Sequence, residues 1–157
     1  MAAAAPAPAV ELLELKRVTV EPNECPLVSP IGVKLDYELS SEVTGGYWAV
    51  FYVIDTVRRR HLIQLGTTSV GDLAKGANSM EFSAKELNFA GVKASRLTTA
   101  GMLTCALRRA KGDAPADGDE ELAAVNMVVQ VETASGKPAG KSTEPAELVR
   151  TVFDPLA

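Results

Sequence analysis

The stretch Ile31-Gly32-Val33-Lys34-Leu35-Asp36-Tyr37-Glu38-Leu39 alternates apolar residues with polar or small ones over its whole length. A period of two places the apolar side chains on one face of a β-strand and the others, including both carboxylates, on the solvent face. Residues 125–131 repeat the pattern, because Val125, Met127, Val129 and Val131 are separated by polar residues at 126 and 130. These two stretches predict strands with one buried face each.

Further strands are predicted around this pair. Tyr47–Ile54 is apolar on both faces, follows a Thr-Gly-Gly turn, and is typical of a central strand in a sheet. Leu97–Leu107 is a long β-like run in which Gly101 marks a bulge or a close-packing point. Shorter strands are expected at residues 12–20, 61–66 and 78–82. Many strands with little helix predict an all-β fold, an immunoglobulin-like β-sandwich.

Helix is expected only as short turns in the loops. Ser83 and Glu86 have the spacing of a capping box, in which each side chain caps a backbone amide near the start of a helix. This spacing predicts a helical turn that begins at Ser83 and ends by Gly91.

The chain length of 157 residues suits one domain. We expect a flexible Ala/Pro leader at residues 1–9, the sandwich at 10–133, and an extended C-terminal tail at 134–157. The leader lacks the charged and Leu-rich regions of a signal peptide. The tail ends in the apolar run Leu148–Phe153, which we expect to dock on this domain or on a partner.

Composition and cysteine usage narrow the class of protein. The chain is 46% hydrophobic and 23% charged with a net charge of −4, which gives no overall nucleic-acid signature. No apolar run reaches the roughly 18 residues that a membrane helix needs. Cys25 lies in a loop-like run and the position two before Cys105 is not tyrosine, so the antibody disulfide is not expected. Free thiols favour an intracellular protein.

The residues offer little for catalysis. His61 is the only histidine, which excludes a His-dependent triad and a multi-His metal site. The acidic residues between Asp113 and Glu121 share one Gly-rich segment but do not keep the ligand order of a calcium loop, so we interpret them as solvated. The sequence therefore predicts no catalytic residue, metal or cofactor.

Arg58-Arg59-Arg60 is the sharpest charge feature. Three adjacent arginines cannot all be buried without partners, so they are expected at an exposed turn or at the start of the next strand. One interpretation is a solvated turn. The other is an anchor for an acidic protein surface, because arginine forms bidentate bonds with carboxylates. No aromatic residues interleave with the arginines as in a nucleic-acid site.

Five runs in order resemble the anti-silencing-function histone chaperone family, over roughly residues 10–133. They are Pro22–Pro30 leading into the alternating strand, Trp48 with Phe51-Tyr52-Val53, Ala74–Phe82, Leu103-Thr104-Cys105, and Val125–Glu132. The resemblance implies an elongated immunoglobulin-like sandwich with short helical turns in its loops. It also implies a histone-binding surface.

The residues of that surface are not retained. Arg58–Arg60 followed by Leu62 stand where the family has acids, and Thr98, Thr99 and Ala100 stand where it has valines. The arginine and tyrosine of its next strand are replaced by apolar and amide residues within 125–129. Like charges facing a basic histone would be unfavourable. The pattern favours a distant relative that kept the sandwich and changed its partner.

We therefore expect a non-catalytic protein-binding module, a structural or adaptor subunit of a larger intracellular assembly. The residues expected to bind protein are Arg58, Arg59, Arg60, Leu148, Val152 and Phe153. Partners would carry an acidic surface, such as tubulin in a cytoskeletal or ciliary setting. No small-molecule substrate, direct nucleic-acid contact or membrane contact is expected. The alternative is a nuclear histone H3–H4 chaperone that uses other residues.

Overall fold

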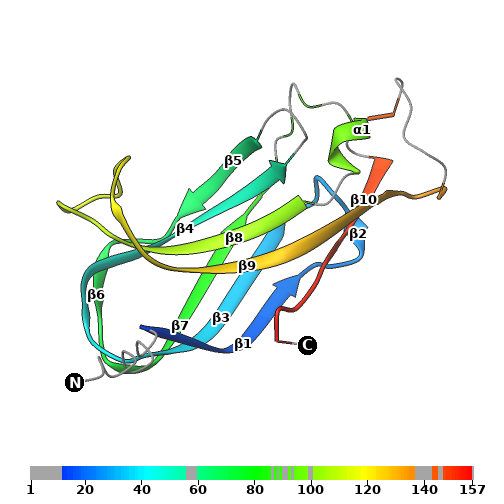
Figure 1. Cartoon of the computed structure of the whole chain (residues 1–157). Coiled ribbons are helices and arrows are strands. Elements are labelled where there is room, and N and C mark those ends of the chain that lie inside the picture. Colours follow the sequence, from blue (N-terminus) through cyan, green and yellow to red (C-terminus); the bar gives the residue numbers. More distant parts are fainter. Residues whose placement is uncertain are drawn as a thin grey trace, which may run out of the picture.

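The computed structural model describes residues 12–55, 60–85, 87, 89, 92, 94–98, 101–136, 143–144 and 147–156. Its elements are β1 (Leu13–Glu21), β2 (Cys25–Pro26), β3 (Ile31–Leu39), β4 (Val43–Asp55), β5 (Arg60–Thr67), β6 (Gly71–Leu73), β7 (Gly76–Ala84), α1 (Ala94–Leu97), β8 (Gly101–Arg109), β9 (Glu120–Thr133) and β10 (Leu148–Val152). Figure 1 shows their arrangement.

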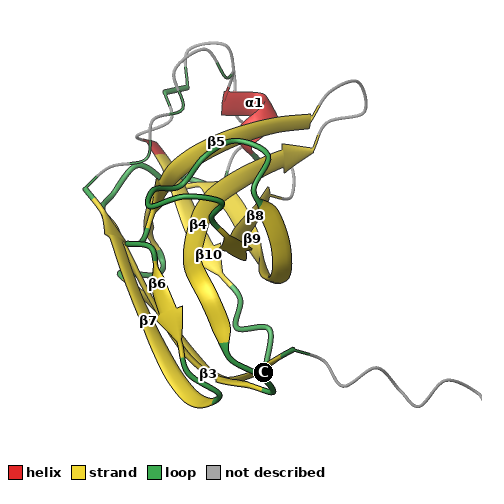
Figure 2. Cartoon of the chain, turned by 90° about the vertical axis from the view of Figure 1, so that its left-hand side faces the viewer, coloured by secondary structure: helices red, strands yellow, loops and turns green. Residues whose placement is uncertain are grey.

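Two sheets pack face to face (Figure 2). The small sheet has the order β1-β3-β7, and the large sheet has the order β2-β10-β9-β8-β4-β5, with β6 paired to β4. Every pairing within them is antiparallel. The prediction of an all-β sandwich is confirmed. The finer immunoglobulin-like assignment stays a prediction.

The core fills the space between the sheets with the inward side chains of alternating strands. Leu35 and Tyr37 of β3 are buried, as the period-two pattern predicts. Trp48 of β4 meets Tyr37 edge to face with ring centres 5.2 Å apart, and its indole N–H donates to the Tyr37 hydroxyl at 3.2 Å. Tyr52 packs in the same way against Phe89, with ring centres 5.3 Å apart. The first pair joins the two sheets, and the second joins β4 to Phe89, which lies between β7 and α1.

Gly101 is a close-packing point, one of the two roles predicted for it. A Cβ atom at this position would overlap the hydroxyl of Tyr52, which lies across the ladder between β4 and β8. The strand predicted from residue 97 begins only at Gly101, because α1 occupies Ala94–Leu97.

The helical turn predicted from Ser83 is wrong. Ser83 and Ala84 form the end of β7 and pair with Gly32 and Ile31 of β3. Backbone pairing with a neighbouring strand satisfies the amides that a capping box would otherwise cap, so the tertiary contact overrides the local signal. Glu86 lies outside the described residues.

The C-terminal run 148–152 is a strand of this domain. β10 pairs with β9 from Leu148↔Thr133 to Val152↔Val129, and with β2 at Val149↔Pro26. The sandwich therefore extends to Val152, which corrects the boundary expected at residue 133. Of the two docking places considered for the tail, the structure shows this domain.

Arg150 fixes the segment 22–30 to β10 from inside the protein. Its side chain is 1% exposed, and it donates to the carbonyl oxygens of Leu27 at 2.9 Å, Ser29 at 2.8 Å, Pro22 at 3.2 Å and Pro30 at 2.8 Å. Burial lowers the pKa of Arg150. A buried cation held by four carbonyl groups is a structural clamp, and sequence reasoning missed it.

Asn23 adds a second tie between the same segment and β10. Its side-chain amide donates to the Val152 carbonyl at 2.9 Å, and its amide oxygen accepts from the Val152 N–H at 2.8 Å. The Leu27 N–H also donates to the Leu148 carbonyl at 2.7 Å. The segment that opens the family resemblance is thus held by β10.

Candidate protein-binding surface

One row of apolar side chains crosses the outer face of the large sheet. The ladder pairs Leu62 of β5 with Val53 of β4, Val53 with Met102 of β8, and Met102 with Val128 of β9. Phe153 follows β10 and donates its backbone N–H to the Val128 carbonyl at 2.9 Å. Residues directly opposite each other in an antiparallel ladder share a face, so these five residues form one line, the outer row. At a strand spacing of about 4.8 Å the line spans roughly 19 Å.

The side chains at the two ends of the outer row are exposed to solvent, and the side chain of Val53 within it is buried. Leu62 is 55% exposed, Val128 52% and Phe153 46%, which makes them three of the large hydrophobic side chains that the described surface exposes. Val53 is buried between them and forms a small cluster with Phe51, Ala106 and Met102. Singly scattered apolar residues are normal on a surface, but a continuous line of them marks an interaction site.

Two arginines lie on the same face beside the outer row. Arg60, the first residue of β5, is exposed and two positions before Leu62. On the other side, the guanidinium carbon of Arg108 lies 5.7 Å from the centre of the Phe51 ring, within cation–π range. An arginine therefore lies on each side of the apolar line, each opposite an acidic residue in the ladder (Arg60↔Asp55 and Arg108↔Glu121), and arginine suits a partner that brings carboxylates.

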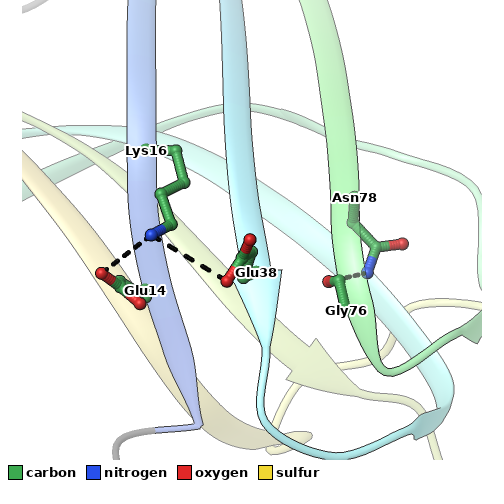
Figure 3. Close-up of polar contacts among 5 residues, drawn as sticks. All are labelled: Glu14, Lys16, Glu38, Gly76 and Asn78. Atoms are coloured by element: carbon green, nitrogen blue, oxygen red, sulfur yellow. Dashed lines mark hydrogen bonds and ion pairs between the residues drawn. The ribbon is translucent and has the colours of Figure 1, made fainter.

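The outer face of the small sheet has the opposite character. Lys16 pairs with Glu14 at 3.0 Å and with Glu38 at 3.9 Å, as Figure 3 shows, and Lys34 pairs with Glu81 at 3.8 Å. Each of these side chains is about half exposed or more. Such a network of solvated charges keeps a sheet face soluble. The apolar face of the large sheet is accordingly the stronger candidate for a protein interface.

The structure separates the residues that were expected to bind protein. Arg58 and Arg59 lie outside the described residues, whereas Arg60 is on the face of the outer row. Leu148 is fully buried and Val152 is 6% exposed, so the expectation that these two side chains contact a partner is corrected. They alternate with outward residues in β10 and fill the core of their own domain. Phe153 is exposed and belongs to the outer row.

Sequence reasoning missed Leu62, Met102 and Val128 as surface candidates. A signal for Val128 was present, because it stands at an outward position between two inward residues of an otherwise alternating strand. The apolar character of Tyr47–Ile54 on both faces was a second signal. In the sequence analysis this pattern predicts a central strand, and β4 does lie between β8 and β5 in the large sheet. Leu62 and Met102 could be recognised only once the ladder registers placed them beside Val53.

The polar groups of the described residues offer no candidate metal site. Among the described residues, no group of three His, Cys, Asp or Glu side chains could hold a metal ion. Of the acidic loop, Asp119 accepts hydrogen bonds from the Tyr47 hydroxyl at 2.6 Å and from the Ala116 N–H at 2.8 Å. Bonding from Tyr47 and from loop amides lowers the pKa of Asp119. This contact holds the loop between β8 and β9 against the sheet, whereas Asp113 and Asp117 are exposed.

Both cysteines are free thiols, Cys105 in the core and Cys25 half-buried. No helix in the described residues has the length and apolar character needed to cross a membrane. No protein-family model matches the chain, and no curated protein is similar to it in sequence. The relation to the anti-silencing-function chaperones thus stays a prediction that rests on the five runs alone.

Proposed function

We propose that this chain is a non-catalytic protein-binding module, an adaptor or structural subunit of an intracellular assembly, that docks a partner on the outer row. The observation that carries the proposal is the continuous apolar line Leu62–Val53–Met102–Val128–Phe153 on the outer face of the large sheet, with Leu62, Val128 and Phe153 exposed. The exposed ends of that line lose contact with water when a partner covers them, which favours association. A large sheet supplies a rigid platform, so little ordering entropy is lost on binding.

The flanking charges indicate the chemistry of the partner. Arg60 and Arg108 would each meet a carboxylate at the rim of the interface, and rim charges determine partner choice and association rate more than affinity. An apolar segment bordered by acidic residues therefore suits the surface. Cytoskeletal and ciliary assemblies, in which tubulin presents acidic surfaces, are the setting that we favour. A basic histone surface would meet these arginines unfavourably.

The test compares charge insertion on and off the outer row. Leu62→Glu and Val128→Glu should each weaken partner binding at least about tenfold, because a carboxylate would be buried against apolar surface. Leu156→Glu is the matched control, since Leu156 is 50% exposed but lies outside the row. The three positions are exposed, so all variants should keep the circular dichroism spectrum of the native protein.

Partners are identified by cross-linking mass spectrometry of the protein purified gently from its native cells, and affinities are then measured with the purified partner. Cross-links from the face of the outer row to one acidic partner, lost in both row variants and kept in the control, would support the proposal. If the row variants bind like the control, the proposed surface is refuted. Row-dependent binding of histones H3 and H4 would replace the adaptor function with the chaperone alternative.

A further inference from the structure

The edge strands of the two sheets differ in how well they are protected from pairing with another chain. In the large sheet, β2 has two residues, β6 has three, and the pairing of β5 is interrupted by a register shift at Leu65. In the small sheet, β1 carries a bulge at Lys16. Short strands, bulges and edge lysines are the devices by which proteins block strand addition. Each of these four edges carries at least one of them.

The remaining edge strand, β7, has none of these devices. Its nine residues pair with β3 without a register shift, from Leu39↔Gly76 to Ile31↔Ala84. It contains no proline and no lysine. In the part of the chain that the structure describes, its second edge pairs with no strand. Figure 2 shows β7 at the margin of the sandwich.

The accessible part of this edge begins after its first residue. The Asn78 side-chain amide donates to the carbonyl oxygens of Ala74 at 2.7 Å and Gly76 at 3.1 Å, and Figure 3 shows the second of these bonds. From Ala77 onward the solvent-facing side chains of β7 are mostly small, namely Ala77, Ser79 and Ser83, with Glu81 among them. Small side chains leave room for large ones on an added strand.

A hollow lies in line with the end of this edge. It has a volume of about 550 Å³ and is lined by residues of all three strands, among them Glu21, Gly32 and Ser83. These three residues form one row across the sheet, because Gly32 pairs with Glu21 on one side and with Ser83 on the other. Gly32 has no side chain, so the centre of the row is a gap. A glycine inside a strand often marks the close approach of a ligand.

Positive charge flanks the edge at both ends. Lys75 precedes β7 and Lys85 follows it, and both are exposed. Among the described residues, neither lysine forms an ion pair, although Lys16 and Lys34 of the same sheet do. Two free cations roughly 30 Å apart along an extended strand favour a ligand with acidic residues at both ends.

We propose that β7 binds an extended segment of a partner protein by strand addition. The segment would carry apolar residues opposite Met80 and Phe82, one large side chain opposite Ser83 that fills the hollow above Gly32, and acidic residues near Lys75 and Lys85. Backbone pairing supplies affinity in this mode of recognition, and the pocket for one side chain supplies specificity. The site uses no residue of the outer row and lies on the other sheet, so it is a second binding site beyond the proposed function.

The probe is a synthetic ten-residue peptide with two aspartates at each end. Its six central residues alternate valine with threonine, and a tryptophan replaces one threonine. Titration of the ¹⁵N-labelled full chain, followed by hydrogen exchange, should slow the exchange of alternate β7 amides, those that point away from β3. Replacing the four aspartates by lysines should weaken binding about fivefold. Unchanged β7 exchange at saturating peptide, or slowed exchange at β1 or β5 instead, would overturn the proposal.

The role of the hollow is tested by changing the protein at Gly32 and, separately, by changing the tryptophan of the peptide. Gly32→Val fills it, and its first contact, the Glu21 carbonyl at 3.4 Å, is ordinary van der Waals contact, so the sheet should be kept. This variant should bind about tenfold more weakly, as should the peptide with alanine for tryptophan. Gly71→Val is the matched control, because a Cβ atom there meets nothing within 4 Å. If Gly32→Val and Gly71→Val bind the peptide with equal affinity, the hollow does not bind the tryptophan side chain.

Leu62→Glu should bind the peptide with the affinity of the native protein, which separates this test from that of the outer row.

Discussion

Replacing Arg150 with methionine should lower the free energy of unfolding by about 2–4 kcal/mol. The guanidinium holds four carbonyl oxygens of the segment 22–30, and methionine replaces the unbranched stem of arginine as far as Nε but has no donor. The variant thus removes the hydrogen bonds and keeps most of the packing. A loss of this size is a large part of the 5–15 kcal/mol by which domains of this kind are stable.

The magnitude follows from the burial of each bond. The bond to the Leu27 carbonyl is buried, and leaving that oxygen without a donor costs about 1–3 kcal/mol. The bonds to Pro22, Ser29 and Pro30 are only partly buried, so water can replace the donor at about 0.5–1 kcal/mol each. Removing a buried cation returns part of this sum, because its desolvation is itself unfavourable, as the lowered pKa of Arg150 indicates.

Urea unfolding, followed by the fluorescence of Trp48, measures the effect, since Trp48 is the only tryptophan and is 2% exposed. The midpoint should fall while the m-value stays constant. Arg109→Met is the matched control: this arginine is about half exposed, pairs with Glu120 at 3.5 Å, and should change stability by less than about 1 kcal/mol. If Arg150→Met is as mild as the control, the guanidinium does not hold the segment 22–30 in place.

Two further predictions concern the core. Gly101→Ala should destabilise the protein by about 1–3 kcal/mol because the new methyl group overlaps the Tyr52 hydroxyl, and adding Tyr52→Phe should recover part of the loss in urea unfolding. If the changes in unfolding free energy of Gly101→Ala and Tyr52→Phe simply add in the double variant, the two side chains do not clash as proposed. Burial raises the pKa of Cys105 to about 12, so its contribution to stability is complete below about pH 9 and is lost as the pH rises towards 12. In native protein a thiol reagent should label Cys25 first, and equal labelling rates would refute this burial.

The strands with strict alternation were predictable from sequence. The run Ile31–Leu39 coincides with β3 to the residue, because one face of that strand is core and the other is solvent. β10 was less predictable, because this five-residue strand is stabilised by its pairing with β9 and by the hydrogen bonds of Arg150, which are contacts between residues far apart in the sequence. The local sequence around Arg150 does not indicate that its side chain will donate to carbonyl groups, because those groups belong to residues 22–30. The mistaken helix at Ser83 has the same origin, a local signal overruled by pairing.

The candidate surface was predictable only in part. Sequence reasoning found Arg60 and Phe153 but placed them in separate segments, a turn and a tail. They share a face because β5 and β10 stand on either side of β4, β8 and β9 in one sheet. Which residues become neighbours across five strands depends on four registers and two register shifts, and none of these is encoded within a single strand. The sequence showed Val128 as an apolar residue at an outward position, but it did not show that Met102 and Phe153 lie beside it.

The positions of the two proposed sites bear on what kind of protein this is. The outer row lies on the outer face of the large sheet, whereas the β7 edge and its hollow belong to the small sheet. The two sites share no residue, although β5 and β7 touch where Gly66 meets the ring of Phe82, so a partner on one site need not displace a partner on the other. Free energies of binding at sites that share no residues add unless a two-state element couples them. A small domain with two such independent sites would hold two proteins together, which is what an adaptor subunit does.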